Sequence, residues 1–172
     1  MELTRTVNGA GAGALAALAW AAQQPLDKLA FGSSYDDVEL LGKAVTRGPS
    51  WPLAGVAMHA ANGAVFGAAY AQLRPFLPGP PAVRGALAGL AEHVALWPLV
   101  RLVDRVHPAR SELTPLSGNT RAYAQAAWRH ALFGAILGEI EHRLNARLHE
   151  EPPPVPASSN GHGNITSAAV TV

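Results

Sequence analysis

The sequence of 172 residues contains no cysteine, which excludes disulfide bonds, thiolate metal sites and cysteine nucleophiles. Charge is also scarce, because Asp, Glu, Lys and Arg make up 15% of the chain, against about 25% in ordinary soluble domains. The net charge is only +1 and the basic residues are dispersed, so nothing favours nucleic acid as a partner. The length fits a single domain.

Signatures of catalysis are missing as well. The sequence has no Ser-His-Asp arrangement, no phosphate-binding loop, no dinucleotide fingerprint and no Cys/His metal spacing. It therefore gives no reason to expect an enzyme. Long runs of leucine are absent too, because the apolar residues, 49% of the chain, are mostly alanine and glycine. The mean hydropathy is accordingly only +0.11.

Four apolar stretches are nevertheless long enough to be considered as membrane spans. A helix needs about 20 residues to cross the hydrocarbon core of a bilayer. The stretch 51–73 contains no Asp, Glu, Lys or Arg, and neither does the shorter stretch 7–24. An N-terminal signal peptide ending at Ala19-Trp20-Ala21 is an alternative for the first stretch. The third and fourth stretches, 84–103 and 120–144, contain charged residues, and each centred charge costs at least about 2.5 kcal/mol on insertion.

An internal repeat supports the two charged stretches as spans. Residues 59–67 (HAANGAVFG) match residues 130–138 (HALFGAILG), and residues 13–19 (GALAALA) match residues 85–91 (GALAGLA). The offsets are 71 and 72 residues, as expected for a tandem duplication. If the charge-free copies cross a membrane, the other copies are expected to cross it too.

We therefore expect an all-α protein, a four-helix transmembrane bundle of two tandem helical hairpins in residues 1–149. Both hairpins would insert the same way up, with a pseudo-twofold axis along the membrane normal. Residues 150–172, rich in Pro, Ser, Asn and Gly, are expected to be disordered. Seven Lys and Arg residues in the stretches 25–50 and 101–121, against five on the other side, favour cytoplasmic placement of these two loops. The expected location is a cell membrane, the inner membrane in a bacterium.

Pairs of glycines one helical turn apart occur in all four stretches. Such pairs allow helix backbones to approach closely, which matters in lipid because hydrophobic attraction between helices is weak. Packing within the bundle is the simpler interpretation, and a homodimer formed through a remaining glycine face is the alternative. The pairs are Gly9 and Gly13, Gly63 and Gly67, Gly85 and Gly89, and Gly134 and Gly138.

His59 and His130 occupy equivalent positions of the repeat, so the pseudo-twofold axis would bring them to similar depth. Two facing histidines flanked by glycine can ligate a haem b, bind a metal or relay protons. The simpler alternative is that each histidine only donates a hydrogen bond to a neighbouring helix. No cofactor is required by the sequence.

Polar residues of the second hairpin form a further group of candidates. We expect Glu92 and Arg129 to form an ion pair between adjacent spans, because ionisable groups at membrane depth find partners. Trp20 and Met58 stand at their places in the first repeat, so charge is expected in one half only. The pair would either fix helix register or line a path for a proton or solute. The full set of intramembrane polar candidates is His59, Asn62, Glu92, His93, Arg129, His130 and Glu139.

Two metal alternatives have less support. Glu139 and His142 have the spacing of half a di-iron site, but the other ligands are missing. The acidic run at residues 36–39 could hold a divalent cation, although a short helix there, capped by Ser34 and with an acidic first turn, is the simpler interpretation.

The run Gln24-Pro25-Leu26-Asp27-Lys28 and the run YDDVELLGK at residues 35–43 resemble segments of uncharacterised small bacterial membrane proteins with four predicted spans. The resemblance covers most of residues 7–147. It implies a four-span fold and a membrane location, but no activity and no functional residue.

Three functional classes follow. A structural or accessory membrane protein is the simplest interpretation, since no residue pattern requires a chemical activity. A small oligomeric transporter or channel would use the intramembrane Glu, Arg and His residues, and a haem- or metal-binding protein would use His59 and His130. A soluble helical domain is the remaining alternative to all three.

Overall fold

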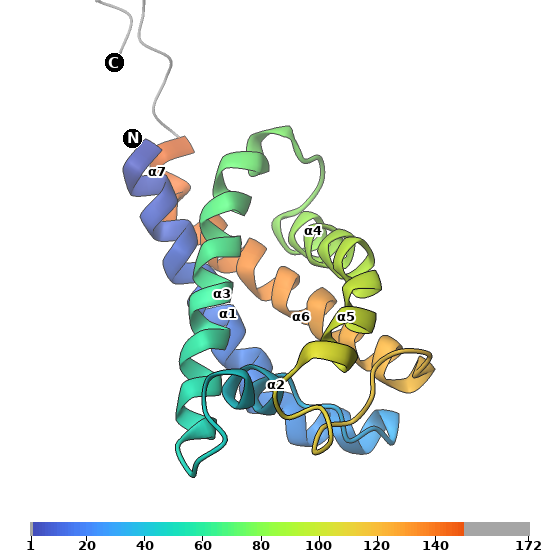
Figure 1. Cartoon of the computed structure of the whole chain (residues 1–172). Coiled ribbons are helices and arrows are strands. Elements are labelled where there is room, and N and C mark those ends of the chain that lie inside the picture. Colours follow the sequence, from blue (N-terminus) through green and yellow to red (C-terminus); the bar gives the residue numbers. More distant parts are fainter. Residues whose placement is uncertain (1, 150–172) are drawn as a thin grey trace, which may run out of the picture.

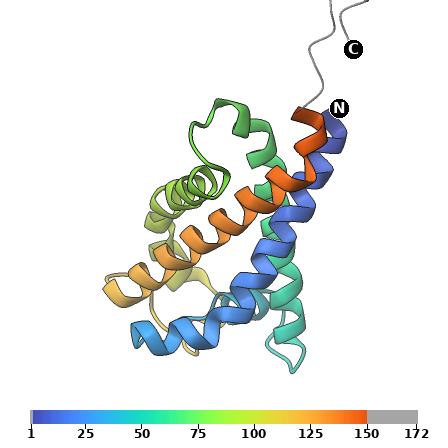
Figure 2. The same cartoon turned by 180° about the vertical axis from the view of Figure 1, so that it is seen from behind.

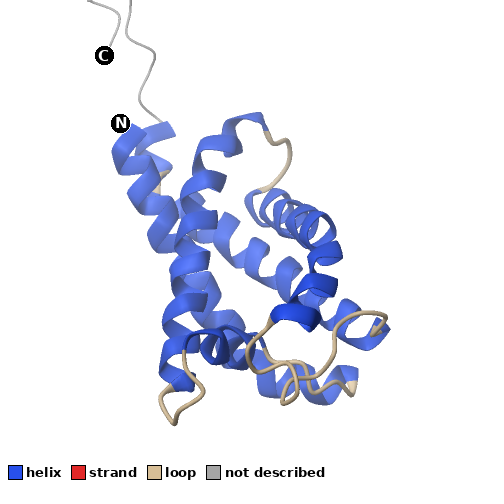
Figure 3. Cartoon of the chain, viewed as in Figure 1, coloured by secondary structure: helices blue, strands red, loops and turns tan. Residues whose placement is uncertain are grey.

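A computed structural model describes residues 2–149, apart from the side chains of residues 2, 147 and 149. Within these residues the chain forms helices and no strand (Figure 3), which confirms the all-α class. The predicted disordered tail lies outside the described residues. In chain order the elements are α1 (Glu2–Phe31), α2 (Asp37–Val45), α3 (Trp51–Leu73), η1 (Arg74–Phe76), α4 (Pro81–Leu96), η2 (Trp97–Leu99), α5 (Val100–Val106), α6 (Thr120–Leu144) and α7 (Ala146–His149).

The helix bounds agree closely with two of the four expected stretches. α3 and α6 begin and end at residues 51–73 and 120–144, as predicted. α1 is longer than predicted and continues through Pro25, which lies on its exposed side. The third stretch is divided, because a 3₁₀ turn containing Pro98 separates α4 from α5.

The short helix α2 begins differently from the prediction. Asp36, not Ser34, is its N-cap, and the Asp36 side chain accepts a hydrogen bond of 2.9 Å from the backbone N–H of Glu39. Ser34 instead contacts Thr114 through its hydroxyl, at 2.7 Å. The prediction of a Ser34 cap was wrong because Asp36, two residues later, accepts a hydrogen bond from a free backbone N–H group in the first turn of the helix.

The long helices form two hairpins around a central pair (Figures 1 and 2). α3 packs on α1, α4 packs on α6, and α1 and α6 contact each other between them. α2 covers part of α3. In Figure 1, α3 is seen from the side and α4 nearly along its axis, so the two outer helices diverge.

Both hairpins point the same way. The connections at residues 32–50 and 107–119 meet at one end, where Arg47 pairs with Glu112 and His107 Nε2 lies 2.9 Å from the carbonyl oxygen of Leu40. At the opposite end Asn8 donates a hydrogen bond of 2.8 Å to Asn145. This is the parallel arrangement of hairpins that the repeat predicted.

All eight glycines of the predicted pairs lie at contacts between helices. A Cβ on Gly13 would lie 1.9 Å from the carbonyl oxygen of Gly63, and a Cβ on Gly85 would lie 2.0 Å from that of Gly134. These two contacts occupy matching places in the two repeats. Since every one of the eight is buried against backbone of this chain, none remains on the surface to pack against a second copy.

Large apolar side chains lie on the exposed faces of several helices, while many polar side chains are buried. The exposed face of α1 carries Val7, Leu15, Leu18 and Leu29, and that of α4 carries Val83, Leu87 and Val94. The interior contains an apolar core of alanines and larger residues such as Trp20, Phe133 and Leu137, together with a group of buried polar residues. The buried polar residues are Gln24, Asp27, Ser33, Asp37, His59, His93, His107, Gln125, Arg129, Glu141 and Asn145.

By length and composition, one helical segment of the described chain, Pro81–Val106, could cross a membrane. It runs from α4 through η2 to the end of α5. The four spans expected from the sequence are therefore not established by this criterion.

Candidate functional site

A buried arginine lies where the two hairpins meet. The Arg129 side chain, on α6, is 0% exposed. Its Nε and Nη2 each lie 2.6 Å from a different carboxylate oxygen of Asp27, on α1, and its Nη1 lies 2.6 Å from Asp37. Nη2 also donates to the carbonyl oxygen of Tyr35, at 3.2 Å. The guanidinium thus joins α6 to both ends of the α1–α2 connection, with the two-point geometry that gives arginine–carboxylate pairs their strength.

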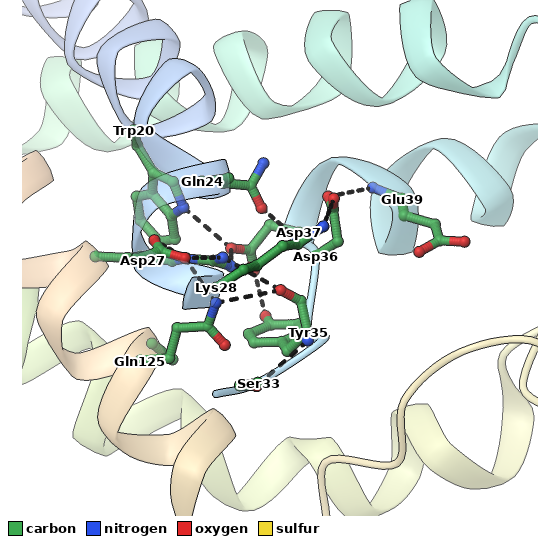
Figure 4. A network of polar contacts seen from close by, with 12 residues as sticks. Trp20, Gln24, Asp27, Lys28, Ser33, Tyr35, Asp36, Asp37, Glu39 and Gln125 are labelled. Atoms are coloured by element: carbon green, nitrogen blue, oxygen red, sulfur yellow. Dashed lines mark hydrogen bonds and ion pairs between the residues drawn. The ribbon is translucent and has the colours of Figure 1, made fainter. Parts of the chain in front are cut away.

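Neutral donors complete the shell of the two carboxylates (Figure 4). Gln125 donates to Asp27 at 2.6 Å, while Trp20 Nε1 donates to Asp37 at 3.0 Å. The Tyr35 hydroxyl donates to Asp37 as well. Burial, with the adjacent Asp37 carboxylate, raises the pKa of the Tyr35 phenol well above its ordinary value, so this donor stays protonated. Buried polar groups with their partners in place favour a single packing arrangement.

The expected ion pair between Glu92 and Arg129 is wrong. Consecutive residues of an α-helix point about 100° apart, because a turn has 3.6 residues. Arg129 therefore faces α1, and it is the next residue, His130, that faces Glu92, with Nε2 3.7 Å from the carboxylate. Since Asp27 and Asp37 belong to the first hairpin, the expectation that charge is confined to the second half is wrong too.

A cavity of about 220 Å³, open to the outside, lies beside this network. Four of the seven polar candidates from the sequence line it: His59 and Asn62 of α3, Glu92 of α4 and His130 of α6. Trp20, Phe66 and Phe133 supply aromatic surface, and Asp37 contributes from the start of α2. All the long helices thus contribute to this one cavity.

His59 and His130 are close to a common neighbour, as their repeat positions suggested. Both rings lie with their centroids 4.8 Å from the indole of Trp20. His130 Nδ1 lies 2.8 Å from the carbonyl oxygen of Ala126, which leaves Nε2 as the nitrogen of this ring that can contact a ligand. The haem alternative stays a prediction.

The remaining candidates lie away from the cavity. His93 is buried behind it, with its ring 5.0 Å from that of His130 and 4.6 Å from that of Tyr123. Glu139 is on the outside of α6 and pairs with Arg143, one turn along the same helix, at 2.8 Å. Among the described residues no group of three or more His, Asp or Glu is placed to hold a metal ion.

Asp27, Tyr35 and Gln125 were missed as candidates, and Asp37 was considered only for a surface cation or a helix cap. Asp27 lies just beyond the end of the first expected span at residue 24, and Asp37 lies in the acidic run 36–39, so neither was placed at membrane depth. Arg129 lies 102 residues from Asp27, and no local pattern links them.

Comparisons with known proteins give no relative from which a role could be transferred: no family model, no curated protein and no solved structure matches the chain.

Proposed function

We propose that the chain is an accessory integral membrane protein whose four long helical segments, α1, α3, α4 with α5, and α6, cross the bilayer. The observation that carries this proposal is the combination of exposed apolar helix faces with buried polar and charged side chains. In a soluble protein a buried charge and a broad exposed apolar surface are both exceptional. In a bilayer both are expected, because apolar side chains face lipid and polar ones turn inward to find partners.

α3 supports the proposal most clearly. Its 23 residues contain no charged side chain, and its buried positions are held by small or polar residues such as Gly55, His59 and Gly63. Its exposed positions include Leu53, 76% exposed, and Val65, 72% exposed. A helix of a soluble protein would place these two kinds of residue the other way round.

The glycine contacts support the same placement. α1 with α3, and α4 with α6, meet backbone to backbone through glycine, which is the usual means by which helices associate in lipid. The segment Pro81–Val106 also satisfies the length and apolarity required of a span. The absence of any recognised catalytic signature in the sequence is the reason for proposing an accessory role.

The proposal is tested by fractionating cells that express the full chain. We expect the protein to remain in the membrane pellet after washes with alkaline carbonate and with high salt, and to be released by detergent. Release by either wash without detergent would contradict the proposal. A known peripheral membrane protein and a known integral one, followed in the same samples, calibrate the two washes.

A further inference from the structure

We propose that the central cavity is a binding site for a small organic monocation, an ammonium group carried on a short hydrocarbon body. The cavity lies between Trp20, Glu92 and His59, beside the Arg129 network, and is open to the outside. This inference does not depend on the membrane proposal, since it concerns the cavity of the folded chain.

The net charge around the cavity is negative and favours the binding of a cation. Asp37 and Glu92 line it, and Asp27 shares Arg129 with Asp37 behind it. Three carboxylates therefore lie at or next to the cavity with a single arginine, which pairs with two of them. If His130, 3.7 Å from Glu92, carries a proton, one negative charge is still in excess. In surroundings of low dielectric constant such an excess is stabilised by one bound positive charge.

Glu92 and His59 are the polar groups with capacity for a ligand. The distance from the Glu92 carboxylate to His130 Nε2 is beyond hydrogen-bonding range, so its oxygens can accept from a bound N–H group. His59 is 7% exposed, and its buried Nε2 has no hydrogen-bond partner among the described residues. Buried polar atoms normally have one, so this nitrogen fits a partner supplied by a ligand.

The aromatic lining selects an organic cation over a metal ion. Phe133 contacts both Trp20 and Phe66 in edge-to-face geometry, with ring centroids 5.9 Å and 5.4 Å apart. Aromatic rings attract ammonium groups and also bury hydrocarbon. A hard metal ion would need six or more oxygen ligands instead, and the described residues contain no such cluster.

The test measures binding of benzylamine to the purified full chain, in detergent, by isothermal titration calorimetry. Benzyl alcohol, which has nearly the same shape without the charge, and sodium chloride are the comparison probes. We expect saturable binding of benzylamine, with benzyl alcohol binding at least about tenfold more weakly. Sodium at matched concentration should not compete.

Glu92→Gln removes the charge and should weaken benzylamine binding by about tenfold or more. Glu139→Gln is the matched control, since Glu139 is a carboxylate on the outside of α6 and should leave binding unchanged. If Glu92→Gln does not fold, Asn62→Phe serves in its place. Asn62 is exposed, so the larger ring should enter the cavity without disturbing the core and should reduce binding.

Three results would overturn the proposal. The first is that benzylamine and benzyl alcohol bind equally well. The second is that Glu92→Gln, or Asn62→Phe if Glu92→Gln does not fold, binds benzylamine as tightly as the wild type. The third is that benzylamine shows no saturable binding at millimolar concentration.

Discussion

Gly13 of α1 and Gly63 of α3 approach so closely that a Cβ on Gly13 would lie 1.9 Å from the carbonyl oxygen of Gly63. The same contact recurs between Gly85 of α4 and Gly134 of α6 at 2.0 Å. The repeat detected in the sequence is thus a repeat of one helix-to-helix contact. Two copies of this contact build the two hairpins.

Enlarging a contact glycine should therefore separate the helices. We expect Gly63→Leu to lower the free energy of unfolding by about 1–3 kcal/mol or more, because backbone atoms cannot make room for the side chain. Thermal unfolding in detergent measures the effect, and Gly134→Leu should behave alike. Gly11→Leu is the control, since nothing lies within 4 Å of a Cβ at Gly11. Equal stability of the Gly63 and Gly11 variants would contradict the contact.

Replacing the buried Arg129 should lower the free energy of unfolding more than replacing an exposed arginine. Arg129→Met leaves Asp27 and Asp37 buried without their cation, which should cost about 3–5 kcal/mol of unfolding free energy. Arg143→Met, on the same helix, breaks an exposed pair and should cost no more than about 1 kcal/mol. Chemical denaturation of both variants makes the comparison. Similar losses in the two would show that Arg129 does not hold the hairpins together.

Acid should weaken the contact between the two loops. Hydrogen bonds from Lys43 and Arg47 hold the pKa of Glu112 below its ordinary value of 4.5. Because the pKa of Glu112 is lower in the folded state, its ion pairs stabilise the fold fully above about pH 4.5. This stabilisation is lost as the pH falls through the lowered pKa of the folded state. The melting temperature of the wild type should therefore exceed that of Glu112→Gln at neutral pH. The two should converge in acid, whereas a difference independent of pH would contradict this contribution.

The sequence predicted the bounds of the helices well where the local composition of the chain is sufficient to define them. α3 coincides with a charge-free stretch that ends before Arg74, and α6 begins directly after its N-cap Asn119. The glycine contacts were predicted from the spacing of the glycine pairs, and the parallel hairpins were predicted from the repeat. Whether the helices cross a membrane stays a prediction.

The polar site was predicted only in part, for a geometric reason. His59, Asn62, Glu92 and His130 were predicted as polar residues at membrane depth, His59 and His130 as an equivalent pair of the repeat, and all four line one cavity. The partner of Arg129 was assigned from sequence proximity between spans. The rotation of a helix about its axis decides which neighbour a residue faces, and the apolar pattern of α6 does not fix that rotation. Asp27 was overlooked because the first expected span ended at residue 24, whereas α1 continues to Phe31.

The central claim is that the exposed apolar faces of these helices contact lipid. Since the chain has no cysteine, single cysteines can be introduced at Val65, Leu87 and Arg47, all of which are more than half exposed in the structure. The measurement is the rate of modification by a membrane-impermeant maleimide in vesicles of both orientations. We predict that Arg47→Cys reacts in one orientation, and that Val65→Cys and Leu87→Cys stay unmodified in both. Rapid modification of all three without detergent would contradict the claim.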